Sequence, residues 1–324
     1  METDGEAANP GPLAEFVLTN ANCTSLRTQF EEVVALPGTI KTISETRLPE
    51  AAQKQYGAML ADKHHQVIWG APCRRKRFGS RVSPGGVAVL AVKGLNMQKV
   101  APRNAAEREA YDSGRFLHVA VSLGAETLHV IVIYGYTNSV RDRFQRDLNE
   151  KLLGIALECS ASLGQVPVAI CGDLNTTIEA SNMLCTAIRG GGFKDLAALG
   201  AEQQGLDNPQ NTCFQNAKCK GSRIDHVLAN KILAPCFHGY GMIKCGLPTH
   251  VPQQVTFNLE QVRQDGVRYR QPKELPLGWQ LKDREQEDMA AAEALHPMLA
   301  SSALLWEACI AGGGCRDCLR ALVR

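Results

Sequence analysis

The stretch from 166 to 175 most constrains what this chain can fold into, because it reads V-P-V-A-I-C-G-D-L-N. Its apolar, largely β-branched residues predict a strand buried in a core. The strand ends at Gly172, and Asp173 and Asn175 follow at once. In a layered α/β protein, polar residues at the carboxyl end of a core strand lie where ligands bind. The same two residues can also form a turn that caps the next helix, so the remaining chain must decide between a site and a turn.

Other segments alternate between strand and helix patterns. The segment 98–114 is polar and irregular, and the T-T-I-E-A-S-N-M-L run after the G-D-L-N strand is helix-like to about 189. About eight to ten strands and fewer helices in mixed order predict two packed sheets with helices outside. The predicted strands are 15–23, 39–44, 67–70, 87–92, 115–123, 127–136 and 254–259, and the predicted helices are 26–34, 51–63 and 140–161.

The ends of the chain differ from its middle. Residues 1–14 are acidic, small and turn-forming, which predicts a disordered tail without a secretion signal. After 260 the composition becomes charged and then Ala-rich, which predicts a helical C-terminal extension over 261–324, outside a main domain at 15–260. The C-x-x-C of Cys315 and Cys318 has no second pair at zinc spacing, so we expect no metal there.

Composition narrows the classes of function. The 12 cysteines are scattered, several inside apolar runs, which favours a reduced intracellular protein, nuclear or cytoplasmic. No apolar stretch reaches the about 20 residues that a membrane span needs. A net charge of +2 indicates no global polyanion-binding surface, so any affinity for nucleic acid must come from a local patch. The sequence indicates no stable protein partner.

Polar side chains recur where the predicted strands end. The ordered motifs N-x-T-S-L, S-E-T-R, Y-G-Y-T-N, G-D-L-N, S-R-I-D-H and T-H-V-P resemble those of the exonuclease–endonuclease–phosphatase superfamily. Within it, S-E-T-R-L and S-R-I-D-H-V-L are most similar to the apurinic-type endonuclease domains of non-LTR retrotransposons. The resemblance covers about 15 to 260. The strand-end residues are Asn22, Glu45, Tyr134, Asp173 with Asn175, and Asp225 followed by His250.

This resemblance implies a four-layered αββα sandwich of two mixed sheets, of the DNase I type, that hydrolyses phosphodiesters with Mg²⁺ or, as a substitute, Mn²⁺. Glu45 would be the main metal ligand, with Asn22 bound directly or through water, since Mg²⁺ takes hard oxygen ligands and few carboxylates. Asp173 would orient and deprotonate the attacking water. These assignments predict a retroelement-type DNA endonuclease.

The remaining assigned residues would act on the phosphate. Asn175 would donate to it, His250 would stabilise its transition-state charge, and Asp225 would hold the His250 imidazole. Tyr134 would donate a further hydrogen bond. Tyr136 is an alternative to Tyr134, because Y-G-Y-T-N is one residue longer than the usual family pattern.

Two positions depart from the family pattern. The family usually has Asp before the last His, where this chain has Thr249, and often an acid two places after the first Asn, where this chain has Thr24. Both changes remove negative charge beside the expected metal and should weaken Mg²⁺ binding.

A basic loop follows the strand at 67–70. It is either a solvated surface run or a contact for the phosphates of duplex DNA, the expected partner. The other readings that the sequence leaves open are a phosphoesterase of the same fold acting on RNA, phospholipid or inositol phosphate, and a retroelement fragment that has lost activity. The expected phosphate contacts are Arg74, Arg75, Lys76, Arg77 and Arg223, with Lys218 and Lys220 as additions.

Overall fold

A computed structural model describes residues 15–73, 85–124, 126–215 and 220–258. The chain divides into two units, Met1–Gly266 and Val267–Arg324, and all of the described residues belong to the first. The predicted tail at 1–14, the basic residues 74–77, Lys218 and the predicted helical extension lie outside the described residues.

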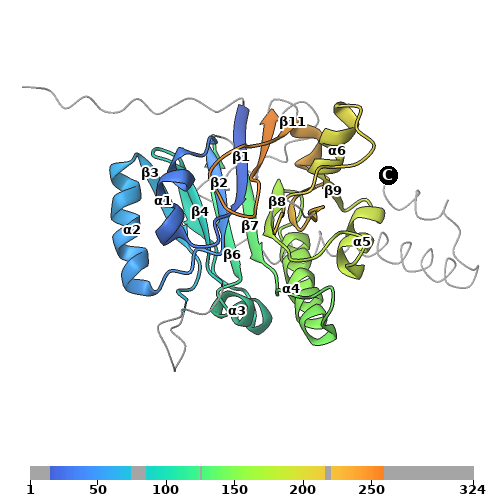
Figure 1. Ribbon diagram of the computed structural model, residues 1–324, viewed down its shortest axis with the longest axis horizontal. Helices are drawn as coiled ribbons and strands as arrows, with labels where there is room; N and C mark the ends of the chain where they lie inside the picture. Colours follow the sequence, from blue (N-terminus) through green and yellow to red (C-terminus); the bar gives the residue numbers. More distant parts are fainter. Residues whose placement is uncertain (1–14, 74–84, 125, 216–219, 259–324) are drawn as a thin grey trace, which may run out of the picture. The chain divides into compact units, whose positions relative to one another are not determined.

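Two six-stranded mixed sheets form the centre of this unit (Figure 1). The first has the order β11-β12-β1-β2-β4-β3, and the second has the order β5-β6-β7-β8-β10-β9. Strands of the first sheet are β1 (Glu15–Asn22), β2 (Ile40–Ser44), β3 (His65–Trp69), β4 (Val87–Val92), β11 (Phe237–Met242) and β12 (Gln253–Asn258). Strands of the second are β5 (Asn96–Lys99), β6 (Phe116–Leu123), β7 (Glu126–Tyr134), β8 (Val168–Asp173), β9 (Phe193–Asp195) and β10 (Asp225–Asn230).

Alternation along the strands places one set of side chains between the sheets and the other under the helices. Phe16 and Leu18 of β1 meet Val130 and Val132 of β7 in the central core, where Phe16 also stacks on Phe257 with ring centroids 4.8 Å apart. This core is apolar on both sides, so burial of its surface holds the two sheets together.

Helices cover the outer faces (Figure 1). The first pair, α1 (Leu26–Ala35) and α2 (Glu50–Asp62), packs on the first sheet. On the second sheet lie α3 (Ala105–Asp112), α4 (Arg143–Ser162) and α5 (Asn182–Arg189), whereas α6 (Leu196–Gln203) packs against β10 and β11. In the described ranges, no helix is both long and apolar enough to cross a membrane.

Strand register brings distant residues into one row. In the second sheet, β7 runs parallel to β8 and β10 runs antiparallel to it, which pairs Tyr134 with Asp173 and Asp173 with Asp225. The approach of β7 and β8 requires Gly172, which has φ +137°, because a Cβ there would lie 1.8 Å from the carbonyl oxygen of Ile133. In the first sheet, β1 pairs with β2 in parallel and with β12, the last described strand, antiparallel.

The predicted four-layered αββα sandwich of two mixed sheets is confirmed. Three local predictions are wrong. Residues 98–114 are not irregular: they contain the end of β5 and all of α3, where the Asn104 side chain caps the helix by accepting from the Glu107 amide. The helix after G-D-L-N begins only at Asn182, because Ser181 provides the cap and turns fill the interval. Asp225 starts a strand instead of ending one, yet antiparallel pairing leaves it at the same rim as Asp173.

The number of strands also exceeds the expected eight to ten. Twelve are present in the described part of the chain, including β9 and β11, which the sequence pattern does not predict. With three residues, β9 is too short for an alternating pattern, and β11 contains Gly239 and Gly241, which are unusual in strand interiors.

Candidate active site

Asp173 lies at the centre of the polar rim and is held from both sheets. Its Oδ2 accepts from the Asn22 Nδ2 at 2.8 Å, a bond that joins β8 to β1 across the sandwich. Its Oδ1 accepts from the backbone N–H of Asn175 at 2.9 Å. Because both oxygens are held, the carboxylate has a fixed direction, as a group that orients a water must have.

Asp225, next to Asp173 in the row, holds His250. The Nδ1 of His250 donates to Asp225 Oδ2 at 2.8 Å, and the hydroxyl of Thr212 donates to the same oxygen at 2.7 Å. The Nε2 of His250 is thereby turned toward Asn22, whose Nδ2 lies 3.5 Å away. The structure thus brings together Asn22, Asp173, Asp225 and His250, which come from four separate motifs of the sequence.

Burial and charge set the protonation states of this cluster. Burial lowers the pKa of His250, but the charge and hydrogen bond of Asp225 outweigh it and raise that pKa to about 11. Burial, followed by the charge of Asp225, raises the pKa of Asp173 to about 7, although His250, Asn175 and Asn22 act in the opposite direction. Near neutral pH, His250 is therefore a cation and Asp173 is poised to exchange a proton.

Glu45 follows β2 and lies in a turn that the structure ties to Gly86. The Glu45 side chain is 9% exposed, and its Oε1 accepts from both the Nε and the Nη2 of Arg47, with the Nε bond measuring 3.1 Å. The backbone of both residues is left-handed, with φ 61° at Glu45 and 54° at Arg47. A side chain on Gly86 would meet the Thr46 Oγ1 at 2.3 Å, so this glycine lets the turn pack closely.

Tyr134 is the strand-end tyrosine that the structure brings into the row. It is almost fully buried, and burial, followed by the charges of Glu45 and Asp173, raises the pKa of its phenol well above the usual range, so it remains a hydrogen-bond donor. The Arg115 guanidinium lies 4.8 Å from the ring centroid of Tyr134 and 4.3 Å from that of Tyr136. It also donates to the carbonyl oxygens of Tyr134 and Gly135, at 3.1 and 2.6 Å, which fixes the end of β7.

Asn175 also has left-handed backbone, with φ 49°, and its Nδ2 donates to the Gly135 carbonyl at 3.2 Å. This bond ties the G-D-L-N turn to the end of β7. Asparagine tolerates this backbone region better than most residues do, which explains its place in the motif.

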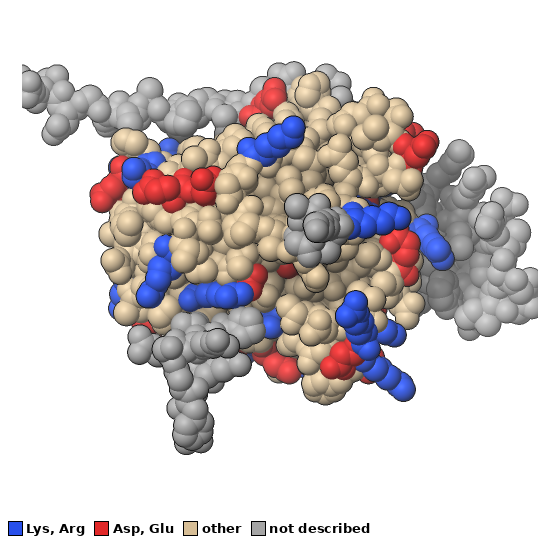
Figure 2. Space-filling model, in the orientation of Figure 1, with Lys and Arg blue, Asp and Glu red and all other residues tan. Residues whose placement is uncertain are grey.

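The expected phosphate contacts are placed only in part. Arg223 forms an ion pair with Asp195 at 2.8 Å and its side chain is 12% exposed, whereas Lys220 is exposed. Figure 2 shows the described Lys and Arg side chains scattered over the face in view, without one broad basic patch among them. Contact between Arg223 and a phosphate therefore stays a prediction.

Three contacting residues escaped the sequence reasoning. Arg47 lies inside the quoted S-E-T-R motif, but nothing in the motif says that it folds back onto Glu45. Thr212 and Gln253 lie outside the quoted motifs, and Gln253 donates to the backbone carbonyl of Asp225 at 3.0 Å. Thr212 and Gln253 depend on tertiary contacts, and Arg47 depends on two left-handed backbone angles; a single sequence signals neither.

Two groups of residues could hold a cation. Asp173, Asp225 and His250 each offer an atom within 4.8 Å of the others, and His250 could bind a metal there only with its imidazole deprotonated. On the loops that follow β1 and β2, the hydroxyl oxygens of Thr24 and Thr46 are buried without a hydrogen-bond partner. The loops of these residues touch, since Leu26 N donates to the Thr46 carbonyl at 3.2 Å. Mg²⁺ takes hard oxygen ligands and few protein carboxylates, so the Glu45 carboxylate is a ligand of the kind that this cation binds.

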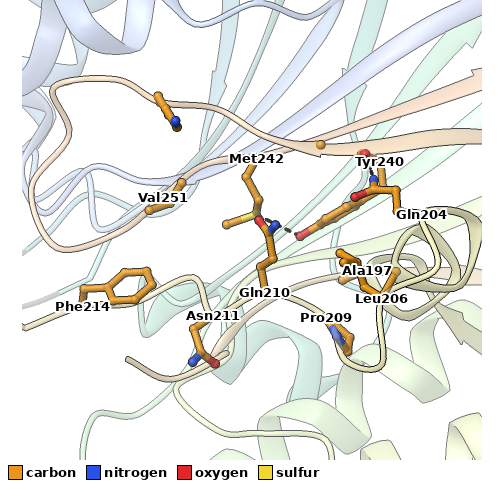
Figure 3. Close-up of a pocket in the computed structure, with 13 residues that line it drawn as sticks. Ala197, Gln204, Leu206, Pro209, Gln210, Asn211, Phe214, Tyr240, Met242 and Val251 are labelled. Atoms are coloured by element: carbon orange, nitrogen blue, oxygen red, sulfur yellow. Dashed lines mark hydrogen bonds between the residues drawn. The ribbon is translucent and has the colours of Figure 1, made fainter. Parts of the chain in front are cut away.

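A large cavity lies beside the site. It measures about 630 Å³ and is lined mainly by apolar and amide side chains, including Tyr240, Met242 and Gln210 (Figure 3). Its lining residues Asn211 and Val251 are the sequence neighbours of Thr212 and His250. The lining contains no carboxylate or imidazole, whereas the row of Asp173, Asp225 and His250 has both.

Two packed six-stranded mixed sheets with flanking helices form a DNase I-like fold. No family model matches the sequence, and no curated protein matches it either. Solved structures do match. An AP endonuclease from Archaeoglobus fulgidus aligns with a TM-score of 0.57 and 16% identity, over 75% of this chain and 99% of that chain.

Two further structures agree. The APE2 catalytic domain from Xenopus laevis has a TM-score of 0.58 and 16% identity, over 75% of this chain and 91% of its own. The 3′-5′ exonuclease NExo from Neisseria meningitidis has a TM-score of 0.55 and 13% identity, over 75% and 99%. At these identities the likeness shows the fold, and the link to retrotransposon endonucleases stays a prediction.

Proposed function

We propose that this chain is a divalent-cation-dependent phosphodiesterase that cuts duplex DNA, of the retroelement endonuclease type. The observation that supports this most is the row of Tyr134, Asp173 and Asp225, completed by His250 and joined to Asn22 of the other sheet. The matched structures point the same way, since they include an AP endonuclease and a 3′ phosphatase bound to a product DNA hairpin.

Asp173 is the general base in this proposal. Its carboxylate, held by Asn22 and the Asn175 amide, accepts a proton from a water that attacks the phosphorus. A pKa of about 7 suits this task, because the group is substantially ionised at neutral pH and still basic enough to take the proton.

The remaining groups act on the phosphoryl oxygens. Protonated His250, fixed by Asp225, places a positive charge where negative charge develops. Tyr134 and the second N–H of the Asn175 amide supply neutral donors. Glu45, with Asn22 bound directly or through water, would hold Mg²⁺, which would polarise a phosphoryl oxygen and stabilise the leaving group.

The decisive experiment measures nicking of supercoiled plasmid and of a duplex with one abasic site. It also measures hydrolysis of an RNA and of a phospholipid headgroup substrate. We expect nicking of duplex DNA that EDTA abolishes and Mg²⁺ or Mn²⁺ restores. Asp173→Asn should lower the rate by roughly two to four orders of magnitude, the range for a positioned base. Asp62→Asn, on an exposed position of α2, is the matched control and should cut like the parent.

Other results would replace the proposal with one of its rivals. Preference for the RNA or headgroup substrate would indicate another phosphoesterase of this fold. Absence of hydrolysis on every substrate, with the protein folded, would indicate a fragment that has lost activity. If Asp173→Asn cuts as fast as the parent, Asp173 only forms a turn.

A further inference from the structure

The pairing of Glu45 with Arg47 raises a question about how a cation reaches this site. The carboxylate best suited to hold the cation already has a positive partner, and two nitrogens of that partner bond the same oxygen. A divalent cation placed against Glu45 would lie next to the guanidinium, and like charges a few ångströms apart repel strongly in a partly buried place.

The turn fixes the two side chains on each other. Thr46 N donates to the Gly86 carbonyl at 3.0 Å and Arg47 N donates to the Gly85 carbonyl at 3.1 Å, so the backbone on both sides of the pair is anchored. Because Glu45 and Arg47 both have left-handed backbone, their side chains meet although they are only two positions apart. The pair is therefore a built feature of the site.

The two partners differ in their freedom. Arg47 has a side chain that is 40% exposed, whereas that of Glu45 is 9% exposed. Arg47 can swing into solvent, but Glu45 cannot follow it, and a buried carboxylate left without a partner is costly. Departure of Arg47 is thus favourable only if another cation takes its place.

A phosphodiester offers Arg47 a second partner at the same site. Backbone bonds link Arg47 to this region, since its N–H donates to the Gly85 carbonyl and Gly86 N donates to the Gly114 carbonyl. The residue after Gly114 is Arg115, which lies 4.8 Å from the ring centroid of Tyr134, the group that we assign to the phosphate. The planar fork of arginine matches a phosphate as well as it matches a carboxylate.

Resting on the proposed function, we propose that Arg47 is a positioning residue that changes partners. It neutralises Glu45 while the site is empty and moves to a substrate phosphate when DNA arrives, which frees Glu45 for the cation. Binding of DNA and binding of the cation then favour each other, and this coupling is reciprocal. The missing acids at Thr24 and Thr249 make the exchange matter more, because Glu45 is the single carboxylate among the described residues of this turn and its neighbouring loop.

The first test measures Mn²⁺ binding directly, by the loss of the free-ion signal in electron paramagnetic resonance, on the full chain without DNA. Arg47→Gln removes the charge and keeps much of the side-chain length, so we expect Mn²⁺ to bind about tenfold more tightly, within the usual range of coupling between sites. Arg108→Gln, on an exposed position of α3, changes the net charge equally and should match the parent. If Arg47→Gln does not fold, Arg47→Asn replaces it, because asparagine tolerates left-handed backbone.

The second test measures the coupling through fluorescence anisotropy of a labelled duplex with phosphorothioate linkages, with and without Mn²⁺. In the parent, Mn²⁺ should tighten DNA binding about tenfold, and in Arg47→Gln the factor should fall close to one. Arg108→Gln should keep the parent's factor.

Several outcomes would overturn the proposal. One is an unchanged Mn²⁺ affinity in the folded Arg47 variant, and another is a gain that survives in the Glu45→Gln, Arg47→Gln double variant. Both tests measure binding without turnover. If nicking is absent throughout while Arg47→Gln still binds Mn²⁺ more tightly, the proposed hydrolysis fails and the exchange of partners stands.

Discussion

Replacing Asp225 by Asn is the sharpest single test of the site, because it removes one charge and almost no volume. In the parent, Asp225 raises the pKa of two neighbours: it keeps His250 protonated and charged, and it keeps Asp173 protonated and neutral to higher pH. Both pKa values should therefore fall in the variant, which the pH dependence of the nicking rate can report.

The magnitude follows from the His250 pair. A rise of its pKa from 6.5 to about 11 corresponds to about 6 kcal/mol, and measured costs of breaking buried ion pairs are about 3–5 kcal/mol. Taking the measured range, the pKa of His250 should fall by about two to four, to between about 7 and 9. The positive charge that we propose to stabilise the transition state is then lost within an accessible pH range.

The assay is the nicking rate from about pH 6 to 10 at saturating Mg²⁺, with Asp62→Asn as the control. The parent rate should rise through about pH 7, as Asp173 ionises, and then stay level. The variant should be slower by about two to four orders of magnitude, by analogy with loss of the carboxylate from a catalytic triad, and its rate should fall again above about pH 8.

The free energy of unfolding gives an independent check, because the direction in which it changes with pH follows from the His250 pKa. A raised His250 pKa stabilises the fold below 6.5, and this contribution is lost as the pH rises toward about 11. In urea titrations above about pH 8, where Asp173 is already ionised, the parent should lose stability with pH and Asp225→Asn should lose much less. Superimposable pH–rate and pH–stability curves for parent and variant would refute the assignment of the Asp225–His250 pair.

Two further predictions concern metal and DNA binding. Thr249→Asp should lower the Mg²⁺ concentration needed for half-maximal nicking, because it adds negative charge beside His250. The position is exposed and has left-handed backbone, φ 64°, which Asp tolerates better than Thr does. Coincident Mg²⁺ titrations of parent and variant would exclude Thr249 as the limiting defect. Replacing Arg74, Arg75, Lys76 and Arg77 together with Ala should weaken duplex binding and flatten its salt dependence, by about 0.9 in log–log slope for each DNA phosphate that the variant no longer neutralises. An unchanged slope would place this loop away from the DNA.

Much of the fold was predictable, because its strands have local signatures. The V-A-I-C run of β8 and the alternating strand β4 can each be predicted as a strand from six residues of local sequence. The residue types of the G-D-L-N turn also indicate its backbone conformation, since only glycine fits at position 172 against Ile133 and Asn175 tolerates left-handed backbone. The prediction that residues 98–114 are irregular was wrong for a local reason. The helix α3 begins at a cap formed by Asn104, and its polar composition gives no clear helix pattern.

The site was predictable as a set of residues and not as a set of interactions. Asp173 and Asp225 could be assigned to one rim, but the antiparallel register that pairs them is a property of the whole sheet. The Asn22–Asp173 bond crosses between sheets, and the Glu45–Arg47 pair depends on two unusual backbone angles. The first interaction arises only when separate segments meet, and the second arises from backbone angles that the residue types do not specify, so the sequence pattern predicts neither.

The pairing of β1 with β12 has a consequence for the newly made chain. Strand β1 must wait for residues 253–258 before its antiparallel neighbour exists, and Asn22 must wait for both Asp173 and His250. At ribosomal rates of about 5–20 residues per second, roughly 12 to 50 s pass between synthesis of Asn22 and completion of β12. During that interval β1 is an unpaired edge strand of the first sheet. Such an edge can pair with other chains and aggregate unless a chaperone protects it. Because β12, the last described strand, pairs beside β1, the proposed active site cannot assemble on a ribosome-bound half of this domain.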